Sequence, residues 1–549
     1  MSDILDFAIV GGGASGVYTA WRLARATERE LRKIRAQIGG EGPLNIAIFE
    51  GSDRIGGRLL SASPSSMPDT PMEIGGMRFL NNQPLVRDLV HKLGIAHHEQ
   101  VVDAPDNYAW LRRRHFIQSN LNKPEAKLPY NLTDVEKAVV KSAATQSPAE
   151  LIFWAVYQEF PEINGMKPDE LEAFLRKAKV GGRDLYDIGF WNLLSRHLSH
   201  EGRQLAITTI GYDVLGANAN AVDIIAENFD FTPDTKYYLF DDGFEAMLWE
   251  LANQFQKSGH IHMERVLDSF DDFEMDDGKT AMRLRFEDGE DVEARAIVLA
   301  MPQAAIQGLR RTGPVLDPER APEVQQLLHA VEGIPLYKLF LIYETPWWKE
   351  QCGLKEGRSL TDIPVRQCYY WSTNDDSYSA IMAYNDQASS SFWGGYQIGP
   401  LGPRDAAQSG FGARPFESRH DEWITPKDHL GERRRKNWED HKAPHEMVVE
   451  MHRQLMEMHR VASAPFPIDA AFMDWMNAPY GGAVHFWNPG YKSWEVVEKM
   501  PQPVDGVNAF IVGEAYSTVQ TWVEGAFQTS EIALGKLGMD SPGWLQEQG

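Results

Sequence analysis

FAIVGGGASG, at residues 7–16, joins a short apolar stretch to a glycine-rich turn, and apolar residues then recur at helical spacing over residues 17–23. A strand, such a turn and a helix together are typical of a dinucleotide-binding unit. Gly11 allows the tight turn, Gly13 lets the backbone approach a pyrophosphate, and Gly16 lets the helix pack closely on the strand. This stretch therefore predicts the first βαβ unit of a Rossmann-like domain.

The helix after the turn begins near Ala14 and Ser15, where free N–H groups and the positive end of the helix dipole can face phosphates. We expect the polar residues 28–33 to extend this helix as far as the glycine-rich loop at residues 39–43.

Glu50 ends the second apolar strand, expected over residues 46–49, and its carboxylate can accept hydrogen bonds from a ribose 2′-hydroxyl. An acid at this place favours FAD or NAD over NADP. The interval of 34 residues from Gly16 to Glu50 exceeds the usual spacing of about 20. We attribute the excess to the lengthened helix and its loop.

The composition restricts the class of protein. The chain has 549 residues and a formal net charge of −24, which predicts two or three domains and argues against a nucleic-acid partner. Cys352 and Cys368 are the only cysteines, which excludes a disulfide scaffold and a cysteine-rich metal site, and we propose no metal ligands. No apolar run is long enough for a membrane helix, and residues 1–10 lack the basic residues of a signal peptide, so a cytoplasmic protein is expected.

Four ordered motifs follow the first strand pair: GSDRIGGR at residues 51–58, EIGGMRF at 73–79, VGE at 512–514 and TWVEGA at 521–526. They resemble the motifs of the flavin amine oxidase family, and residues 263–302 resemble the family's middle dinucleotide-domain segment. The resemblance implies an FAD enzyme, and a homodimer is expected by resemblance only.

The predicted fold class is α/β (α+β mixed), with a discontinuous Rossmann-like FAD-binding domain, a mixed-sheet substrate domain and a helical insert. The predicted FAD-binding domain comprises residues 1–70, 236–330 and 468–549. The substrate-binding domain comprises residues 71–120 and 331–467, and the helical domain comprises residues 121–235. Strands are expected over residues 336–343 and 367–372, and a helix is expected over residues 245–255. Residues 389–432, rich in Gly, Pro, Ser and charge, predict a long loop without a recognisable motif.

The resemblance, with the physical character of the residues, assigns further cofactor contacts. Arg54 and Arg58 can pair with pyrophosphate oxygens through the guanidinium fork. Small residues let the backbone pass the flat flavin, and Glu514 resembles the acceptor for the ribityl or ribose chain. The expected cofactor contacts after Glu50 are Gly51, Arg58, Gly75, Gly76, Met77, Arg78, Val266, Gly513, Glu514, Trp522 and Val523.

The segment that carries a cofactor-linking cysteine in monoamine oxidases has none here. Alignment on Pro489-Gly490 puts Gly482 at that position and Ala483 where an aromatic residue of the amine cage would stand. The resemblance therefore implies non-covalent FAD and an incomplete cage, and both features favour an amino acid as substrate.

Arg78 is the most informative residue for the substrate. GGMR at residues 75–78 resembles the arrangement of L-amino acid oxidases, in which this arginine binds the substrate α-carboxylate. Tyr370 is expected to supply a second hydroxyl to the carboxylate, whereas Tyr369 should face the opposite way. A structural ion pair for Arg78 and a core position for either tyrosine are the alternatives.

Trp522 resembles the aromatic residue that walls the substrate beside the flavin, and the resemblance implies that the Thr521 carbonyl accepts from the substrate amine. Lys338 interrupts an apolar strand at residues 336–340 and resembles the family lysine that holds a water near flavin N5 and assists the reaction with oxygen. The alternative for Lys338 is a side chain that faces solvent on a half-exposed strand.

The expected reaction is oxidative deamination of an L-amino acid, with hydride transfer from Cα to flavin N5 and formation of a 2-oxo acid, ammonia and hydrogen peroxide from oxygen. An L-amino acid 2-monooxygenase, which would yield an amide, resembles this sequence equally well around Arg78. A polyamine or monoamine oxidase comes third, and a protein that binds FAD structurally or acts as a desaturase is an alternative of another class. The preferred side chain stays open.

Overall fold

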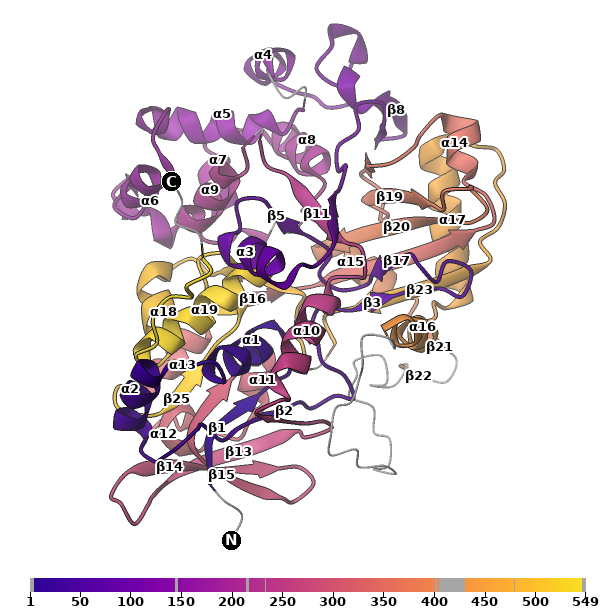
Figure 1. Cartoon of the computed structure of the whole chain (residues 1–549). Coiled ribbons are helices and arrows are strands. Elements are labelled where there is room, and N and C mark those ends of the chain that lie inside the picture. Colours follow the sequence, from indigo (N-terminus) through magenta and orange to yellow (C-terminus); the bar gives the residue numbers. More distant parts are fainter. Residues whose placement is uncertain are drawn as a thin grey trace.

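The computed structural model describes residues 4–143, 147–213, 217–232, 234–399, 402–403, 430–477 and 479–545. Its first sheet lies at the bottom of Figure 1 and combines strands from distant parts of the chain. β1 (Leu5–Val10) runs parallel between β2 (Ile46–Phe49) and β15 (Asp291–Leu299). The sheet continues through β12 (His260–His262) beside β2, β25 (Ala509–Ile511) beside β15, and the antiparallel β14 (Thr280–Phe286) and β13 (Leu267–Glu274).

Both faces of the first sheet are covered. Phe7 and Ile9 belong to the core with α1 (Ala14–Leu23), α10 (Glu245–Phe255) and α19 (Val523–Lys536), whereas Ala8 and Val10 belong to the core on the opposite face. Burial on two faces explains why this strand is a continuous apolar run rather than an alternating one.

The predicted single helix after the glycine-rich turn is wrong. The chain leaves helical structure after Leu23 and begins α2 (Glu28–Ile38) anew. Thr27 caps this second helix: its hydroxyl accepts from the Glu30 amide, and the Glu30 carboxylate accepts from the Thr27 amide. A capping box of this kind satisfies amide groups that a continuous helix would bond internally, so it favours a new start at Thr27.

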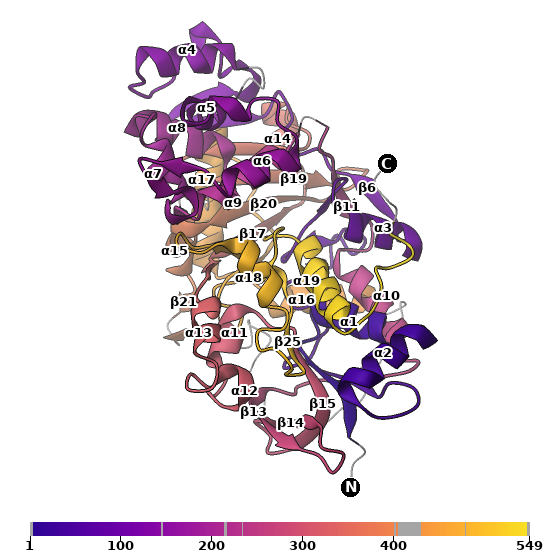
Figure 2. The same cartoon turned by 90° about the vertical axis from the view of Figure 1, so that its left-hand side faces the viewer.

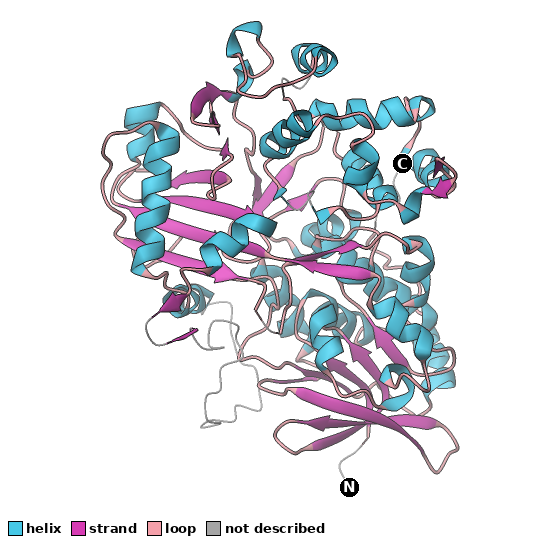
Figure 3. Cartoon of the chain, turned by 180° about the vertical axis from the view of Figure 1, so that it is seen from behind, coloured by secondary structure: helices cyan, strands magenta, loops and turns pink. Residues whose placement is uncertain are grey.

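A second sheet, at the right of Figure 1, has the strand order β23-β17-β20-β19-β18-β7-β8. Its strands are β23 (Asp469–Asp474), β17 (Leu336–Tyr343), β20 (Ser379–Asp386), β19 (Gln367–Ser372), β18 (Arg358–Thr361), β7 (Tyr108–Leu111) and β8 (Arg114–Ile117). Every residue of β17 is buried, and α17 (His445–His459) packs across the sheet, as Figure 3 shows. β17 and β19 have the bounds that the sequence predicts.

Helices dominate the part of the chain predicted as a helical insert, which lies at the top of Figure 2. They are α4 (Asp134–Ser142), α5 (Glu150–Glu159), α6 (Pro168–Leu175), α7 (Phe190–Leu194), α8 (His200–Ile210) and α9 (Ala221–Asp230). These helices share an apolar core that includes Leu151, Leu205 and Ile225. Among the described helices of the whole chain, none is long and apolar enough to cross a membrane.

The predicted domain bounds stay a prediction, but one strand is placed differently from them. β23 falls in the predicted third segment of the FAD-binding domain, yet it pairs with β17 in the second sheet. The predicted loop at residues 389–432 lies mostly outside the described residues. Its start is part of α15 (Gln387–Gly394), and its end begins α16 (Leu430–Asp440).

Candidate active site

A cavity of about 800 Å³ brings together residues of both sheets and of the helical part. The predicted site residues that line it are Gly11, Gly13, Ala14, Ser15, Glu50, Gly51, Arg58, Gly75, Gly76, Met77, Arg78, Val266, Lys338, Gly513, Glu514, Thr521, Trp522 and Val523. Gly16, Arg54 and Tyr370 are the predicted residues outside this lining.

The glycines of the first turn meet different requirements. Gly11 has φ +111°, and a Cβ there would lie 2.2 Å from the Ala300 carbonyl oxygen. A Cβ on Gly16 would lie 1.9 Å from the Gly11 carbonyl oxygen, so this glycine serves close packing of helix on strand. A Cβ on Gly13 would meet nothing closer than the Cα of Gly57, at 3.7 Å. Gly13 thus leaves open space at the helix N-terminus, where an anion is favoured.

Glu50 lies at the end of β2, next to this turn, because β1 and β2 are parallel and in register. Its Oε2 accepts from the Gly12 amide at 2.6 Å, and its Oε1 accepts from the amide and hydroxyl of Ser52 at 2.8 and 2.7 Å. These bonds fix a buried carboxylate in the cavity wall. Its remaining lone pairs can accept from a ribose hydroxyl.

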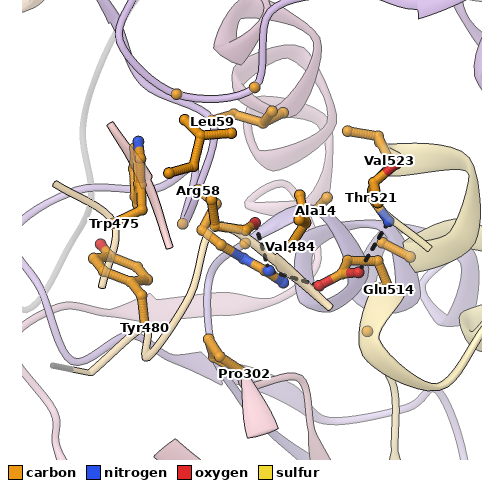
Figure 4. Close-up of a pocket in the computed structure, with 18 of the residues that line it drawn as sticks. Ala14, Arg58, Leu59, Pro302, Trp475, Tyr480, Val484, Glu514, Thr521 and Val523 are labelled. Carbon is orange, nitrogen blue, oxygen red and sulfur yellow. Dashed lines mark hydrogen bonds and ion pairs between the residues drawn. The ribbon is translucent and has the colours of Figure 1, made fainter. Parts of the chain in front are cut away.

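The two arginines predicted for the pyrophosphate have different surroundings. Arg54 is buried and donates to the carbonyls of Gly57 and Leu59, so the structure does not place it in the cavity lining. Its expected phosphate contact is wrong, because its donors stabilise the Gly56-Gly57 loop instead. Arg58 lines the cavity and donates to Glu514 Oε1 at 2.6 Å and to the Ala483 carbonyl at 2.8 Å (Figure 4).

Arg78 lines the cavity with only 8% of its surface exposed. It donates to Gln100 Oε1 at 3.2 Å and to the Tyr212 hydroxyl at 3.0 Å, and its guanidinium lies over the Tyr237 ring at 4.5 Å. Within the described ranges, no carboxylate lies within ion-pair distance of this group. The expected alternative of a structural ion pair therefore has no partner there, and a buried cation of this kind favours an anionic ligand.

The prediction for Tyr370 is wrong. Its side chain points into the core beneath α17, where its hydroxyl lies 2.7 Å from both Ser359 Oγ and His459 Nε2. Successive residues of a strand face opposite sides, and the sequence does not show which side holds the cavity. Tyr212, which follows α8, supplies the hydroxyl beside Arg78 instead.

Lys338 is 2% exposed, so its solvent-facing alternative is wrong. Its Nζ donates to the carbonyl of Glu73 at 2.9 Å and to that of Gly75, both in the second glycine-pair segment. Burial lowers the pKa of Lys338, and Arg78 acts in the same direction while Glu73 opposes it. Burial also raises the pKa of Glu73. Lys338 thus joins β17 to the loop that carries Gly75, and it holds its proton less firmly than an exposed lysine.

Thr521, Trp522 and Val523 form the wall where α19 begins. Thr521 has φ +74°, an unfavourable backbone conformation for a β-branched residue. Its amide donates to Glu514 Oε2 at 3.2 Å, as Figure 4 shows. The strained peptide is therefore attached to the same carboxylate that binds Arg58.

Several lining residues were missed in the sequence. Arg358, on β18, donates to Asp103 at 2.7 Å and to Gln367 at 3.0 Å, and it shares Tyr212 with Arg78. Other missed residues are Tyr212, Tyr237, Tyr384 and Asp386. They come from separate elements and carry no motif. The charge of Arg358 within a strand was the available signal.

The comparisons with known proteins agree with this geometry. The family model of flavin containing amine oxidoreductases matches residues 14–394, and the chain belongs to that family. Aplysianin-A from Aplysia kurodai is 24% identical over 97% of this chain and 90% of its own length. Achacin from Lissachatina fulica is 24% identical over 97% and 93%, and the L-amino acid oxidase Cdc18 from Crotalus durissus cumanensis is 21% identical over 68% and 67%.

Solved structures show the same fold. Wild-type putrescine oxidase bound to putrescine aligns with a TM-score of 0.63 and 15% identity, over 97% of this chain and 98% of that chain. The family match shows an oxidoreductase and the solved structure shows the flavin amine oxidase fold, as the sequence predicts. The residues present fit a flavin dinucleotide: the open space beside Gly13, the buried carboxylate of Glu50 and the Lys338 side chain all belong to one cavity.

Proposed function

We propose that this protein catalyses the FAD-dependent oxidative deamination of L-amino acids to 2-oxo acids and ammonia, with reduction of oxygen to hydrogen peroxide. The observation that carries the proposal is Arg78, a buried cation in the cavity wall with no ion-paired carboxylate in the described part of the chain. A substrate carboxylate would supply the missing negative charge.

Residues from separate elements can orient such a substrate. Arg78 and the Tyr212 hydroxyl would bind the carboxylate, the Thr521 carbonyl would accept from the amine, and Trp522 would wall the side of the substrate. Two fixed polar ends leave the Cα–H with one orientation, which lowers the entropy cost of reaching the reacting geometry. A bound FAD would supply the acceptor for the hydride and then pass electrons to oxygen.

Non-covalent binding of FAD belongs to this proposal. Neither cysteine of the chain lines the cavity: Cys368 is buried in the core beneath α17, and Cys352 lies in α14 (Trp347–Cys352). Gly481 and Gly482 stand in the segment that would carry a cysteine link, and Gly482 approaches Gly333 too closely for any side chain, since a Cβ would lie 2.8 Å from the Gly333 Cα. A released, intact FAD after acid precipitation would support this part of the proposal, whereas flavin that stays with the precipitate would refute it.

The direct test is a screen of the L-amino acids for peroxide, 2-oxo acid and ammonia with purified, FAD-loaded protein. We expect at least one L-amino acid to turn over, while its D-enantiomer does not and its decarboxylated amine does so only with a far lower kcat/KM. Turnover of simple amines at equal efficiency would instead indicate a polyamine or monoamine oxidase. Bleaching of the flavin without peroxide in air would indicate a dehydrogenase or desaturase.

The second candidate function is that of an L-amino acid 2-monooxygenase, which would bind the substrate carboxylate in the same way. It differs in losing carbon dioxide and forming an amide. Mass analysis of the product with catalase present separates the two outcomes, because catalase removes the peroxide that would decarboxylate a 2-oxo acid in solution. A 2-oxo acid as the main product supports the oxidase, and an amide supports the monooxygenase.

A further inference from the structure

His485 is a buried titratable group next to the cavity for which the proposed reaction has no use. It lies in β24 (Val484–Trp487) with 0% of its surface exposed, between two residues, Val484 and Phe486, that line the cavity. Its Nδ1 lies 2.6 Å from Glu514 Oε1. Its Nε2 has no hydrogen-bond partner among the described residues.

The charge state of Glu514 fixes the role of this bond. Burial opposes its ionisation, but Arg58 and His485 outweigh burial and lower the pKa of Glu514 to about 2. An ionised carboxylate only accepts hydrogen bonds, so His485 Nδ1 carries a hydrogen and donates a hydrogen bond to Glu514. The Nδ1–H of His485 is therefore bonded to this carboxylate.

Glu514 divides its two oxygens between different partners. Oε1 accepts from Arg58 and His485, both at 2.6 Å, and Oε2 accepts from the Thr521 amide at 3.2 Å. Arg58 also donates to the Ala483 carbonyl and faces the cavity, so part of its donor capacity is directed elsewhere. His485 is therefore the partner on Oε1 whose hydrogen bonding is directed wholly at Glu514.

Thr521 needs such a support. A β-branched residue with φ +74° stays in that conformation only when its surroundings hold it there. The hydrogen bond from its backbone amide to Glu514 is one such restraint, and rotation of the carboxylate would break this hydrogen bond. A shift of this peptide would move both the Thr521 carbonyl and Trp522, which form the cavity wall.

We propose that His485 is a positioning residue that acts through Glu514 to hold the strained Thr521 peptide in the geometry that receives the substrate amine. This inference rests on the proposed function for the identity of the ligand. The link from His485 through Glu514 to Thr521 does not depend on the proposed function. His485 would act on the orientation of the amine, and Arg78 would bind the carboxylate independently.

Two variants separate donation from bulk. His485→Asn keeps an N–H donor at the same number of bonds from Cβ as Nδ1, and His485→Leu keeps similar volume without a donor. With the best L-amino acid substrate at saturation and without oxygen, we expect His485→Leu to slow flavin reduction about 10- to 100-fold, because small misplacements of a reacting group have effects of this size. We expect His485→Asn to stay within about threefold of the wild type, since its donor is kept.

A ligand without an amine separates the proposed role from general loosening of the structure, because only general loosening would weaken the binding of such a ligand. This ligand is the carboxylic acid with the same side chain as the substrate but no amine, and its binding is followed by the flavin difference spectrum. Its Kd for His485→Leu should lie within about twofold of its Kd for the wild type, because the carboxylate site is unchanged in the variant. An equal loss of acid binding and reduction rate would overturn the proposal. Equal impairment of His485→Asn and His485→Leu, or a wild-type rate in His485→Leu, would also overturn it.

A stability cycle tests the link without any substrate. Thr521→Gly removes the backbone strain, so the loss of Tm caused by His485→Leu should be smaller in the Thr521→Gly background than in the wild type. Equal losses in both backgrounds would refute the link. If no L-amino acid reduces the wild-type flavin while this cycle shows interaction, the proposed function fails and the positioning role of His485 stands.

Discussion

Arg78→Met replaces a buried guanidinium by an apolar side chain of similar length. In the proposed complex, this change removes two charge-assisted hydrogen bonds to the substrate carboxylate, and each such bond contributes about 1.5–3 kcal/mol. The sum of about 3–6 kcal/mol corresponds to a loss of about 10²–10⁴-fold in kcat/KM. The same variant should change Tm little, because removing a buried cation without an ion-paired carboxylate within the described ranges offsets the loss of its hydrogen bonds to Gln100 and Tyr212.

Arg54→Met is the matched control. Arg54 is equally buried, but it lies outside the cavity lining and donates to backbone carbonyls of the Gly56-Gly57 loop. Its loss leaves buried carbonyls without donors, so we expect a lower Tm and weaker flavin retention. Arg78→Met should instead keep the visible flavin spectrum and Tm of the wild type.

The assay is initial-rate peroxide formation over a range of concentrations of the best L-amino acid, with the decarboxylated amine measured beside it. Arg78→Met should reduce the preference for the amino acid over the amine by the same 10²–10⁴-fold, since the amine lacks the carboxylate. A kcat/KM for the amino acid within tenfold of the wild type would refute the role of Arg78. Loss of the flavin would place Arg78 in cofactor binding instead.

The remaining predictions concern the cofactor, oxygen and pH. Gly13→Val should abolish flavin retention while the apoprotein keeps its Tm, because a Cβ at Gly13 has no protein contact closer than 3.7 Å; an intact visible spectrum would contradict this. Lys338→Met should slow reoxidation of the reduced flavin by oxygen at least tenfold more than it slows reduction by substrate, checked by stopped-flow absorbance; equal effects on both half-reactions would count against the oxygen role. Burial raises the pKa of Glu245 from 4.5 to about 7, so between these values the unfolded chain is ionised while the folded protein keeps the proton, and stability falls as pH rises. Glu245→Gln should therefore gain stability relative to the wild type by about 2.5 kcal/mol more at pH 8 than at pH 5. Denaturant unfolding with an equal difference at both pH values would exclude the assignment.

Much of the architecture could be predicted from local patterns. β2, β17, β19 and α10 have the predicted bounds, because each is a clear apolar run or an amphipathic segment between turn residues. The start of α2 was missed although Thr27 and Glu30 form a readable capping-box pattern. The polar residues 28–33 are equally compatible with a continued helix, and this concealed the break.

The site was predictable where its residues lie in contiguous motifs, and less so elsewhere. Arg78 and Glu514 stand in short segments with glycines, whereas Tyr212 and Arg358 reach the cavity from separate elements that only the tertiary fold brings together. For Tyr370, alternation along the strand separated two faces but gave no direction for the cavity. Burial of Lys338 followed from its apolar neighbours, but its bonds to the Glu73 and Gly75 carbonyls did not.

The order of synthesis gives the pairing of β25 with β15 a further meaning. Residues 297–299 pair with residues 509–511, and the cavity wall includes Glu514 and Trp522, which leave the ribosome long after the glycine-rich turn. A nascent chain that has emerged only to residue 480 holds the glycine-rich turn and Glu50 but lacks this wall. We therefore expect stable loading of the cofactor only after residues 509–526 have been translated, and products truncated before residue 509 should retain no flavin.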